Sequence, residues 1–151
     1  MRWTAIITTA FAACLIAGCA PALELPAGFV ELGPDQSGRY DFKAVSADGV
    51  VIALRRIDNS KNATVEFWAK AIENELTWRG HSLVENVPVT SEEGTPGQLM
   101  TFTGQREGQE FTYILGVFVK GGRILLTEAG GKADAFGKRQ AEIGKSLLSV
   151  R

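Results

Sequence analysis

Residues 111–119 constrain the fold of this chain more than any other segment, because they are apolar on both sides. Successive side chains of an extended strand point to opposite faces. Ile114 and Phe118 therefore point to one face, and a larger apolar set points to the other: Phe111, Tyr113, Leu115, Val117 and Val119. Such a strand is typical of a sheet that is covered on both faces. We expect it centrally in a largely antiparallel sheet with helices packed on both sides.

Turn residues divide the rest of the chain into further strands. Ala47-Asp48-Gly49 predicts a hairpin between strands at 40–46 and 50–57, because glycine tolerates the positive φ that such turns need. Gly108 and the pair Gly121-Gly122 mark later turns. The other expected strands are 29–32, 82–89, 99–105, 110–120 and 123–129.

Two segments have helical periodicity. The first runs from Asn62, a candidate N-cap, to Arg79, with Gly80 just past its end. Its inner face consists of Val65, Trp68, Ala69, Ile72 and Leu76. The second is expected from Ala133 to Ser149, with an inner stripe of Phe136, Gln140, Ile143 and Leu147. The order β-β-α-β-β-β-β-α predicts an α+β fold.

The amino-terminal segment resembles a bacterial lipoprotein signal. Arg2 precedes an uncharged run from Thr4 to Ala17, which is shorter than the ~20 residues that span a bilayer and matches the apolar part of a secretory signal. The run ends in Leu15-Ile16-Ala17-Gly18-Cys19, which resembles the lipobox. That resemblance implies cleavage before Cys19 and attachment of a diacylglycerol to its thiol. The alternative is an ordinary signal peptide cleaved elsewhere, with Cys19 incidental.

The chain accordingly divides into a signal peptide (1–18), a tether (19–27) and one domain (28–151). Pro21 and Pro26 fall in the expected tether. Removal of Cys14 with the signal leaves Cys19 without a disulfide partner. Because Ala20 follows Cys19 where an Asp would favour inner-membrane retention, we expect a lipid anchor facing the periplasm, with the outer membrane slightly favoured.

The charge of the chain argues against a nucleic-acid partner. The full sequence has 16 Lys and Arg against 17 Asp and Glu. Removal of residues 1–18 takes away only Arg2 among these, which leaves a formal net charge of −2. Nucleic-acid binding normally needs a concentrated positive surface, and the sequence contains no long basic run.

Over residues 28–151, the order of elements and the ending Phe136…Ile143…Ser146-Leu147 resemble the PsbP-like fold, which includes DcrB-type bacterial lipoproteins. The resemblance implies an α/β/α sandwich with a mainly antiparallel sheet. It further implies a non-enzymatic role, with no shared catalytic residues and no cofactor.

Catalytic and metal sites have weak support in the sequence. His81 is the only histidine, whereas metal sites need several convergent ligands. A Ser–His–Asp site would have to use His81, and no Gly-x-Ser-x-Gly motif accompanies it. Glu92, Glu93 and Glu128 could serve acid–base chemistry if they met in a cleft. The simpler interpretation is that Glu92 and Glu93 form a solvated loop.

Binding surfaces have more support. Arg55 and Arg56 point to opposite faces of one strand, so one of them is a candidate to bind an anion. Phe67 and Trp78 lie nearly opposite the main apolar stripe of the first helix, where they could contact a partner protein. The plainer expectation is that the tether or the loop at 90–97 covers them. We expect a membrane-anchored, non-enzymatic protein-binding or assembly factor of the cell envelope. The alternative is a lipoprotein that binds a small ligand between sheet and helix.

Overall fold

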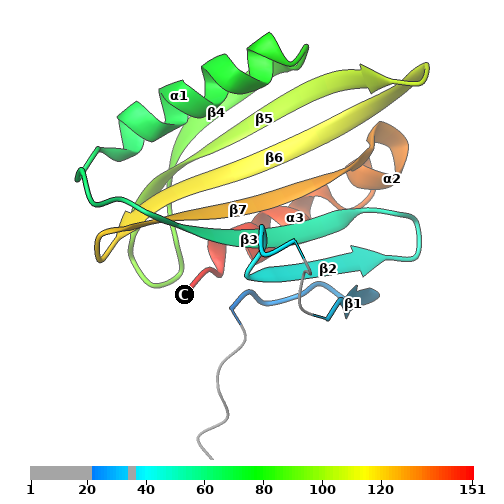
Figure 1. The fold of residues 1–151 in the computed structure, drawn as a ribbon. Helices are drawn as coiled ribbons and strands as arrows, with labels where there is room; N and C mark the ends of the chain where they lie inside the picture. The colour runs from blue at the N-terminus through cyan, green and yellow to red at the C-terminus, as the bar shows by residue number, and fades with distance from the viewer. Residues whose placement is uncertain (1–21, 34–36) are drawn as a thin grey trace, which may run out of the picture.

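The strand that is apolar on both faces is β6 (Gln109–Lys120), and it lies inside a seven-stranded antiparallel sheet (Figure 1). The computed structural model describes residues 22–33 and 37–151. Neighbouring strands pair in the order β1-β2-β3-β7-β6-β5-β4. The other strands are β1 (Phe29–Glu31), β2 (Phe42–Ser46), β3 (Val51–Asp58), β4 (Ser82–Thr90), β5 (Pro96–Arg106) and β7 (Arg123–Lys132).

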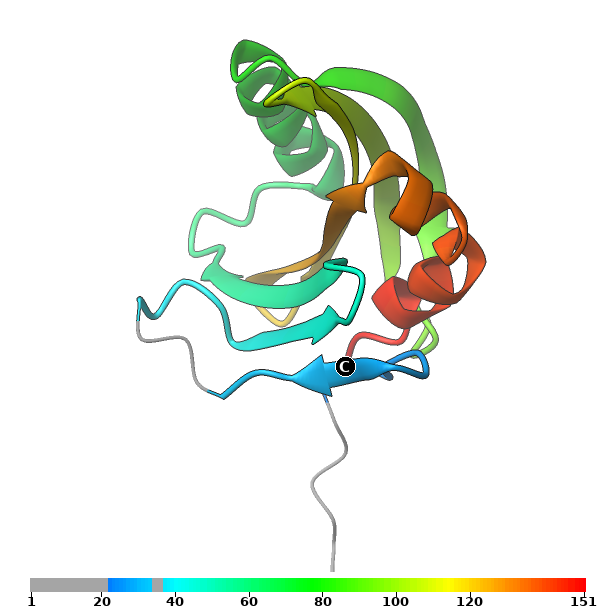
Figure 2. The same cartoon turned by 90° about the vertical axis from the view of Figure 1, so that its right-hand side faces the viewer.

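Helices cover both faces of this sheet, as Figure 2 shows. Leu115 and Val117 of β6 pack under α1 (Val65–Trp78), together with Met100 and Phe102. Ile114 and Phe118 point to the other face, which is covered by α2 (Ala133–Gly137) and α3 (Gln140–Leu148). The expected α+β sandwich and the central position of β6 are therefore confirmed.

Helix α1 begins later than expected. Its N-cap is Thr64, whose hydroxyl oxygen accepts the N–H of Phe67 at 3.3 Å. Asn62, the expected N-cap, has a φ of 53° and forms a turn before the helix. The N-cap prediction was wrong because Asn suits both positions. At the other end Gly80 has a φ of 89°, as its position after the helix requires.

The single carboxy-terminal helix expected over 133–149 is two helices in the structure. The chain leaves helical geometry at Arg139, whose φ is −122°. Gly137 weakens the helix just before this point. Phe136, Ile143 and Leu147 are buried as expected, whereas Gln140 is exposed.

Residues 22–27, part of the expected tether, pack against the domain. Leu23 is 1% exposed and belongs to the core beneath α3. The N–H of Glu24 donates to the hydroxyl of Ser149 at 2.7 Å. The expected signal peptide, Cys14 and Cys19 lie outside the described residues.

Candidate binding site

Helix α1 covers only part of the sheet face on which it lies. It packs mainly on β4, β5 and β6, whereas β7 and β3 lie to one side of it in the sheet (Figure 1). A hollow of about 610 Å³ lies between α1 and strands β3, β7 and β6, and we call it the α1 hollow. Its apolar wall combines side chains from the helix and the sheet: Ile57, Ile72, Leu76, Leu115, Ile124 and Leu126.

A buried carboxylate lies at the floor of the α1 hollow. The side chain of Glu128 on β7 is 8% exposed. Arg55 on β3 donates its Nε hydrogen to one carboxylate oxygen, and Tyr113 on β6 donates its hydroxyl to the other. The strand register explains this arrangement. Glu128 lies opposite Ala53 and Leu115, so Arg55 and Tyr113 are its diagonal neighbours on the same face.

The environment of Tyr113 keeps its hydroxyl protonated. Burial raises the pKa of Tyr113 well above its usual value of 10.0, and the charge of Glu128 and the hydrogen bond to that carboxylate raise it further. The phenol is therefore a fixed hydrogen-bond donor at neutral pH. With both oxygens of Glu128 already hydrogen-bonded, the floor of the α1 hollow is a preorganised polar group.

Arginine and glutamate side chains line the α1 hollow. The lining contains three arginines, Arg39, Arg55 and Arg79, and two glutamates, Glu75 and Glu128. Arg79 pairs with Glu75 on α1 at 2.7 Å, and Arg55 pairs with Glu128. Arg55 bonds to Glu128 through its Nε and is 33% exposed, so part of its guanidinium group is accessible from the α1 hollow.

Tyr40 forms part of the lining beside Arg55. The guanidinium carbon of Arg55 lies 5.8 Å from the centroid of the Tyr40 ring, and the Nζ of Lys43 lies 5.4 Å from the same centroid. Both distances are typical of cation–π contacts. The ring therefore helps to orient Arg55 toward Glu128.

Trp68 forms the helix side of the α1 hollow and is fixed by a buried loop residue. Its indole Nε1 donates to Asn59 Oδ1 at 3.1 Å. Asn59 is 2% exposed, and its amide group also exchanges two hydrogen bonds with the backbone of Ala63. Asn59 thus connects the entry of α1 to the aromatic wall, a role that no sequence pattern indicated.

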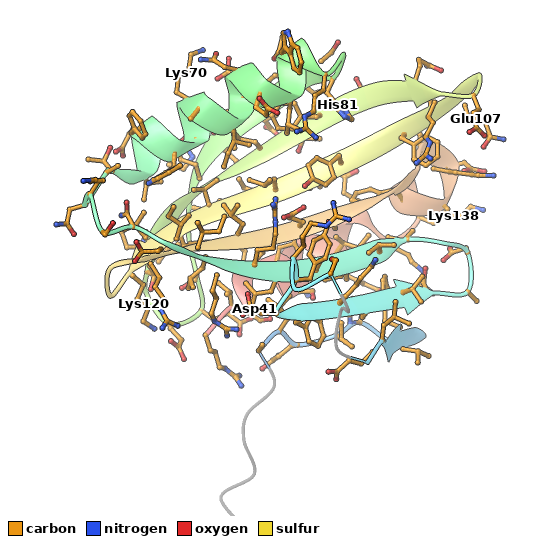
Figure 3. The ribbon with its side chains drawn as sticks, viewed as in Figure 1. Asp41, Lys70, His81, Glu107, Lys120 and Lys138 are labelled. Atoms are coloured by element: carbon orange, nitrogen blue, oxygen red, sulfur yellow. The ribbon has the colours of Figure 1, made fainter. Side chains whose placement is uncertain are left out.

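His81 lies just beyond the end of α1, at the start of β4 (Figure 3). Its ring centroid is 6.3 Å from that of Tyr113, and a Cβ on Gly104 would lie 2.8 Å from its Nδ1. Its Nδ1 has no hydrogen-bond partner within the part of the chain that the structure describes. His81 therefore lies beside Tyr113 without lining the α1 hollow.

The acidic residues considered for acid–base chemistry do not come together. Glu93 pairs with Lys120, and the backbone N–H of Glu92 donates to the carbonyl oxygen of Leu148 at 2.8 Å. Glu128 belongs to the α1 hollow. Across residues 22–33 and 37–151, no three His, Cys, Asp or Glu side chains gather where they could hold a metal ion.

Arg55 and Glu128 are separate candidates in the sequence, and the structure brings them together. Arg56 points to the opposite sheet face, where its Nη2 donates to the carbonyl oxygen of Arg151 at 3.3 Å. Tyr113 and Trp68 were assigned only to apolar faces. The one sequence signal for this cluster was Glu128, an acidic residue within a largely apolar strand.

Phe67 and Trp78 lie outside the α1 hollow and are exposed to solvent by 59% and 83%. Neither residues 22–27 nor the loop at 90–97 covers them, contrary to the plainer expectation. The ring of Phe67 makes an edge contact with Trp68, at a centroid distance of 5.5 Å.

No described helix is long and apolar enough to cross a membrane.

Solved structures with the same architecture define the class of fold. LpqN, which is involved in cell envelope biogenesis in Mycobacterium tuberculosis, superposes with a TM-score of 0.65 at 14% identity, over 83% of this chain and 78% of its own. Cyanobacterial PsbP (CyanoP) from Synechocystis superposes with a TM-score of 0.54 at 10% identity, over 84% and 83%. Protein PA94 from Pseudomonas aeruginosa, of unknown function, superposes with a TM-score of 0.52 at 14% identity, over 82% and 80%.

The chain therefore has a PsbP-like fold, as the resemblance in its sequence implied. No family model and no curated protein matches its sequence. The expected relation to DcrB-type lipoproteins stays a prediction.

Proposed function

We propose that this protein is a lipid-anchored, non-enzymatic binding protein of the bacterial cell envelope. Its α1 hollow would hold a small molecule with an apolar body and an anionic group. The lipobox-like segment ending at Cys19 supports the anchor. The involvement of LpqN in envelope biogenesis agrees with this location.

The α1 hollow is the observation that carries the proposal. Ligand sites in proteins are concave and mostly apolar, with a few convergent polar groups that orient the ligand. The α1 hollow combines an apolar wall with Arg55, Tyr113 and Glu128 on its floor. Because Glu128 is already paired, the ligand would bind mainly through the outer nitrogens of Arg55, whose side chain is 33% exposed.

The fluorescent probe anilinonaphthalene sulfonate tests this site, because it combines an apolar ring system with an anionic group. Saturable binding to the purified full-length chain is expected. Ala71→Trp fills the α1 hollow from the helix side and should weaken binding at least tenfold. Asn74→Trp places the same side chain on an exposed position of α1 and should leave binding unchanged. Equal binding by both variants would contradict the site.

A protein partner is a second candidate function, supported by the exposure of Phe67 and Trp78. Large apolar side chains that are exposed on one face of a helix often belong to contact surfaces. In-cell crosslinking and affinity capture would compare wild type with Cys19→Ser and with Phe67→Ser/Trp78→Ser. A partner that is lost in both variants supports anchored binding through α1. A partner that the double variant retains excludes this surface.

The outer membrane is the proposed location, because Ala20 follows Cys19. Separation of inner and outer membranes on a density gradient tests it. Recovery in the outer-membrane fraction is expected, and Ala20→Asp should move the protein to the inner membrane. Recovery of the wild type in the inner-membrane fraction would contradict this location.

A further inference from the structure

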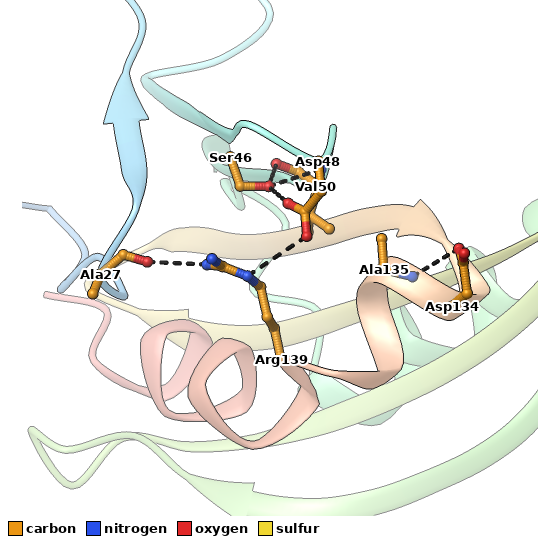
Figure 4. Close-up of polar contacts among 7 residues, drawn as sticks. All are labelled: Ala27, Ser46, Asp48, Val50, Asp134, Ala135 and Arg139. Carbon is orange, nitrogen blue, oxygen red and sulfur yellow. Dashed lines mark hydrogen bonds and ion pairs between the residues drawn. The ribbon is translucent and has the colours of Figure 1, made fainter.

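The domain is fixed close to the proposed lipid site. Leu23 lies in the core, and Arg151 Nη2 bonds to Glu24 Oε1 at 2.7 Å. Figure 4 shows a further contact, in which Arg139 Nη1 donates to the carbonyl oxygen of Ala27 at 3.0 Å while its Nε lies 3.7 Å from Asp48. The segment from Leu23 to Ala27 is therefore part of the folded domain.

The short connection limits how the domain can turn at a membrane. Leu23 follows Cys19 by four residues, which span at most about 14 Å when fully extended. A domain of this length has a radius of gyration of about 14 Å and hence a diameter of about 36 Å. The connection is less than half that diameter, so an acyl group on Cys19 would keep the side of the domain that carries Leu23 against the bilayer.

The β1 edge of the sheet lies on that side. Figures 1 and 2 place the beginning of the described chain, the C-terminus and β1 at the lower margin of the molecule, and α1 at the opposite margin. β1 is the outermost strand of the sheet. It presents Val30, which is 66% exposed, and it is followed by Leu32, which is 40% exposed. Val30 lies opposite Val45 of β2, so the apolar surface continues onto the next strand.

We propose that the β1 edge rests on the bilayer surface, with Val30 and Leu32 in the interfacial region and α1 directed away from the membrane. This inference depends on the lipid anchor at Cys19 in the proposed function. Charges near the edge are mixed, with Lys43 and Arg139 close to Glu31 and Asp48. The lipid surface is therefore recognised by the anchor and by apolar contact, and anionic lipids are not required. In this orientation the α1 hollow and the exposed aromatics of α1 stay accessible to the periplasm.

Two matched positions test the orientation. Val30→Cys and Val84→Cys place single thiols at opposite edges of the sheet, on residues that are 66% and 63% exposed. In the processed, acylated protein no native thiol remains, because Cys14 is removed and Cys19 is a thioether. Each variant is labelled with an environment-sensitive fluorophore and reconstituted into phosphatidylcholine vesicles that carry a headgroup nitroxide. Quenching should be several-fold stronger at position 30 than at position 84.

A longer connection provides the control. A 20-residue Gly-Ser insertion between Pro21 and Ala22 has a root-mean-square length of about 25 Å, so the difference in quenching should largely disappear. Equal quenching at both positions in the unextended protein would overturn the orientation. The mass of the mature protein shows whether Cys19 is acylated. An unacylated Cys19 would contradict the proposed anchor, whereas equal quenching of an acylated protein would contradict only the orientation.

Discussion

Glu128 is the residue on which the candidate site depends. A charged carboxylate inside an apolar strand is costly to bury unless its oxygens are hydrogen-bonded and its charge is paired. Arg55 and Tyr113 supply both from the two neighbouring strands. The same pairing fixes the orientation of the guanidinium group that faces the α1 hollow. Stability and site geometry therefore depend on one carboxylate.

Removing this carboxylate should destabilise the protein. Glu128→Ala leaves the Tyr113 hydroxyl without its acceptor and Arg55 without its counter-ion, which should lower the free energy of unfolding by about 3 kcal/mol. Glu75→Ala breaks the exposed pair with Arg79 and should cost no more than about 0.5 kcal/mol. Urea unfolding measures both variants. An equal loss of free energy of unfolding in both variants would show that the buried pair stabilises the fold no more than the exposed pair does.

The raised pKa of Tyr113 predicts that the free energy of unfolding falls at alkaline pH. Because its folded pKa is raised above 10.0, the folded state keeps a proton that the unfolded chain loses. Its contribution is fully present below pH 10 and decreases as the pH rises above it, by up to about 1.4 kcal/mol per pH unit. Urea unfolding of wild type and Tyr113→Phe at pH 9, 10 and 11 checks this. The wild type should lose stability more steeply above pH 10, and parallel curves would contradict the prediction.

At the scale of elements, local signals placed the strands better than the helix ends. The hairpin at 47–49 and the strands before and after it formed as expected, because a glycine with positive φ marks the turn. The exposed face of α1 carries ion pairs three and four residues apart, Lys70 with Glu73 at 2.8 Å and Arg79 with Glu75 at 2.7 Å. Several Ser, Thr and Asn residues stand before α1, and each has the chemistry of an N-cap. Only the conformation of the chain selects Thr64.

The two candidate N-caps of α1 can be separated by mutation. Thr64→Ala removes the oxygen that accepts the Phe67 N–H and should cost about 1 kcal/mol. Asn62→Gly should be close to neutral, because glycine adopts the φ of 53° at this position without strain. Thermal unfolding measures both variants. A larger loss for Asn62→Gly would return the N-cap to position 62.

At the scale of the whole molecule, the amino-terminal segment completes the core on the α3 side. Leu23 packs among residues far away in the sequence, and Glu24 bonds to Ser149 and Arg151 near the C-terminus. The two ends of the domain therefore stabilise each other. A domain boundary at residue 28 would separate Glu24 from its partners Ser149 and Arg151.

Truncating Leu23 tests whether the segment belongs to the domain. Leu23→Ala should lower the free energy of unfolding by about 3 kcal/mol, as expected for a fully buried leucine. Leu32→Ala, at a position that is 40% exposed, should cost well under half as much. Urea unfolding compares the two. Equal and small losses would mean that residues 22–27 contribute little to the domain.

Local sequence patterns were sufficient to predict the α+β class, the central position of β6 and most strand positions. These depend on periodic apolar patterns and on glycine turns, which act over a few residues. The buried faces of α1 and of the carboxy-terminal segment also followed from such patterns, although not the break at Arg139.

Which side chains meet depends on the folded arrangement of the strands and helices. Arg55, Tyr113 and Glu128 come from three strands whose order in the sheet differs from their order in the sequence, so no local pattern could bring them together. The packing of Leu23 and the exposure of Trp78 likewise depend on what the rest of the chain covers. Whether a side chain is buried depends on which helix or strand packs over it, and that is set by the assembled layers.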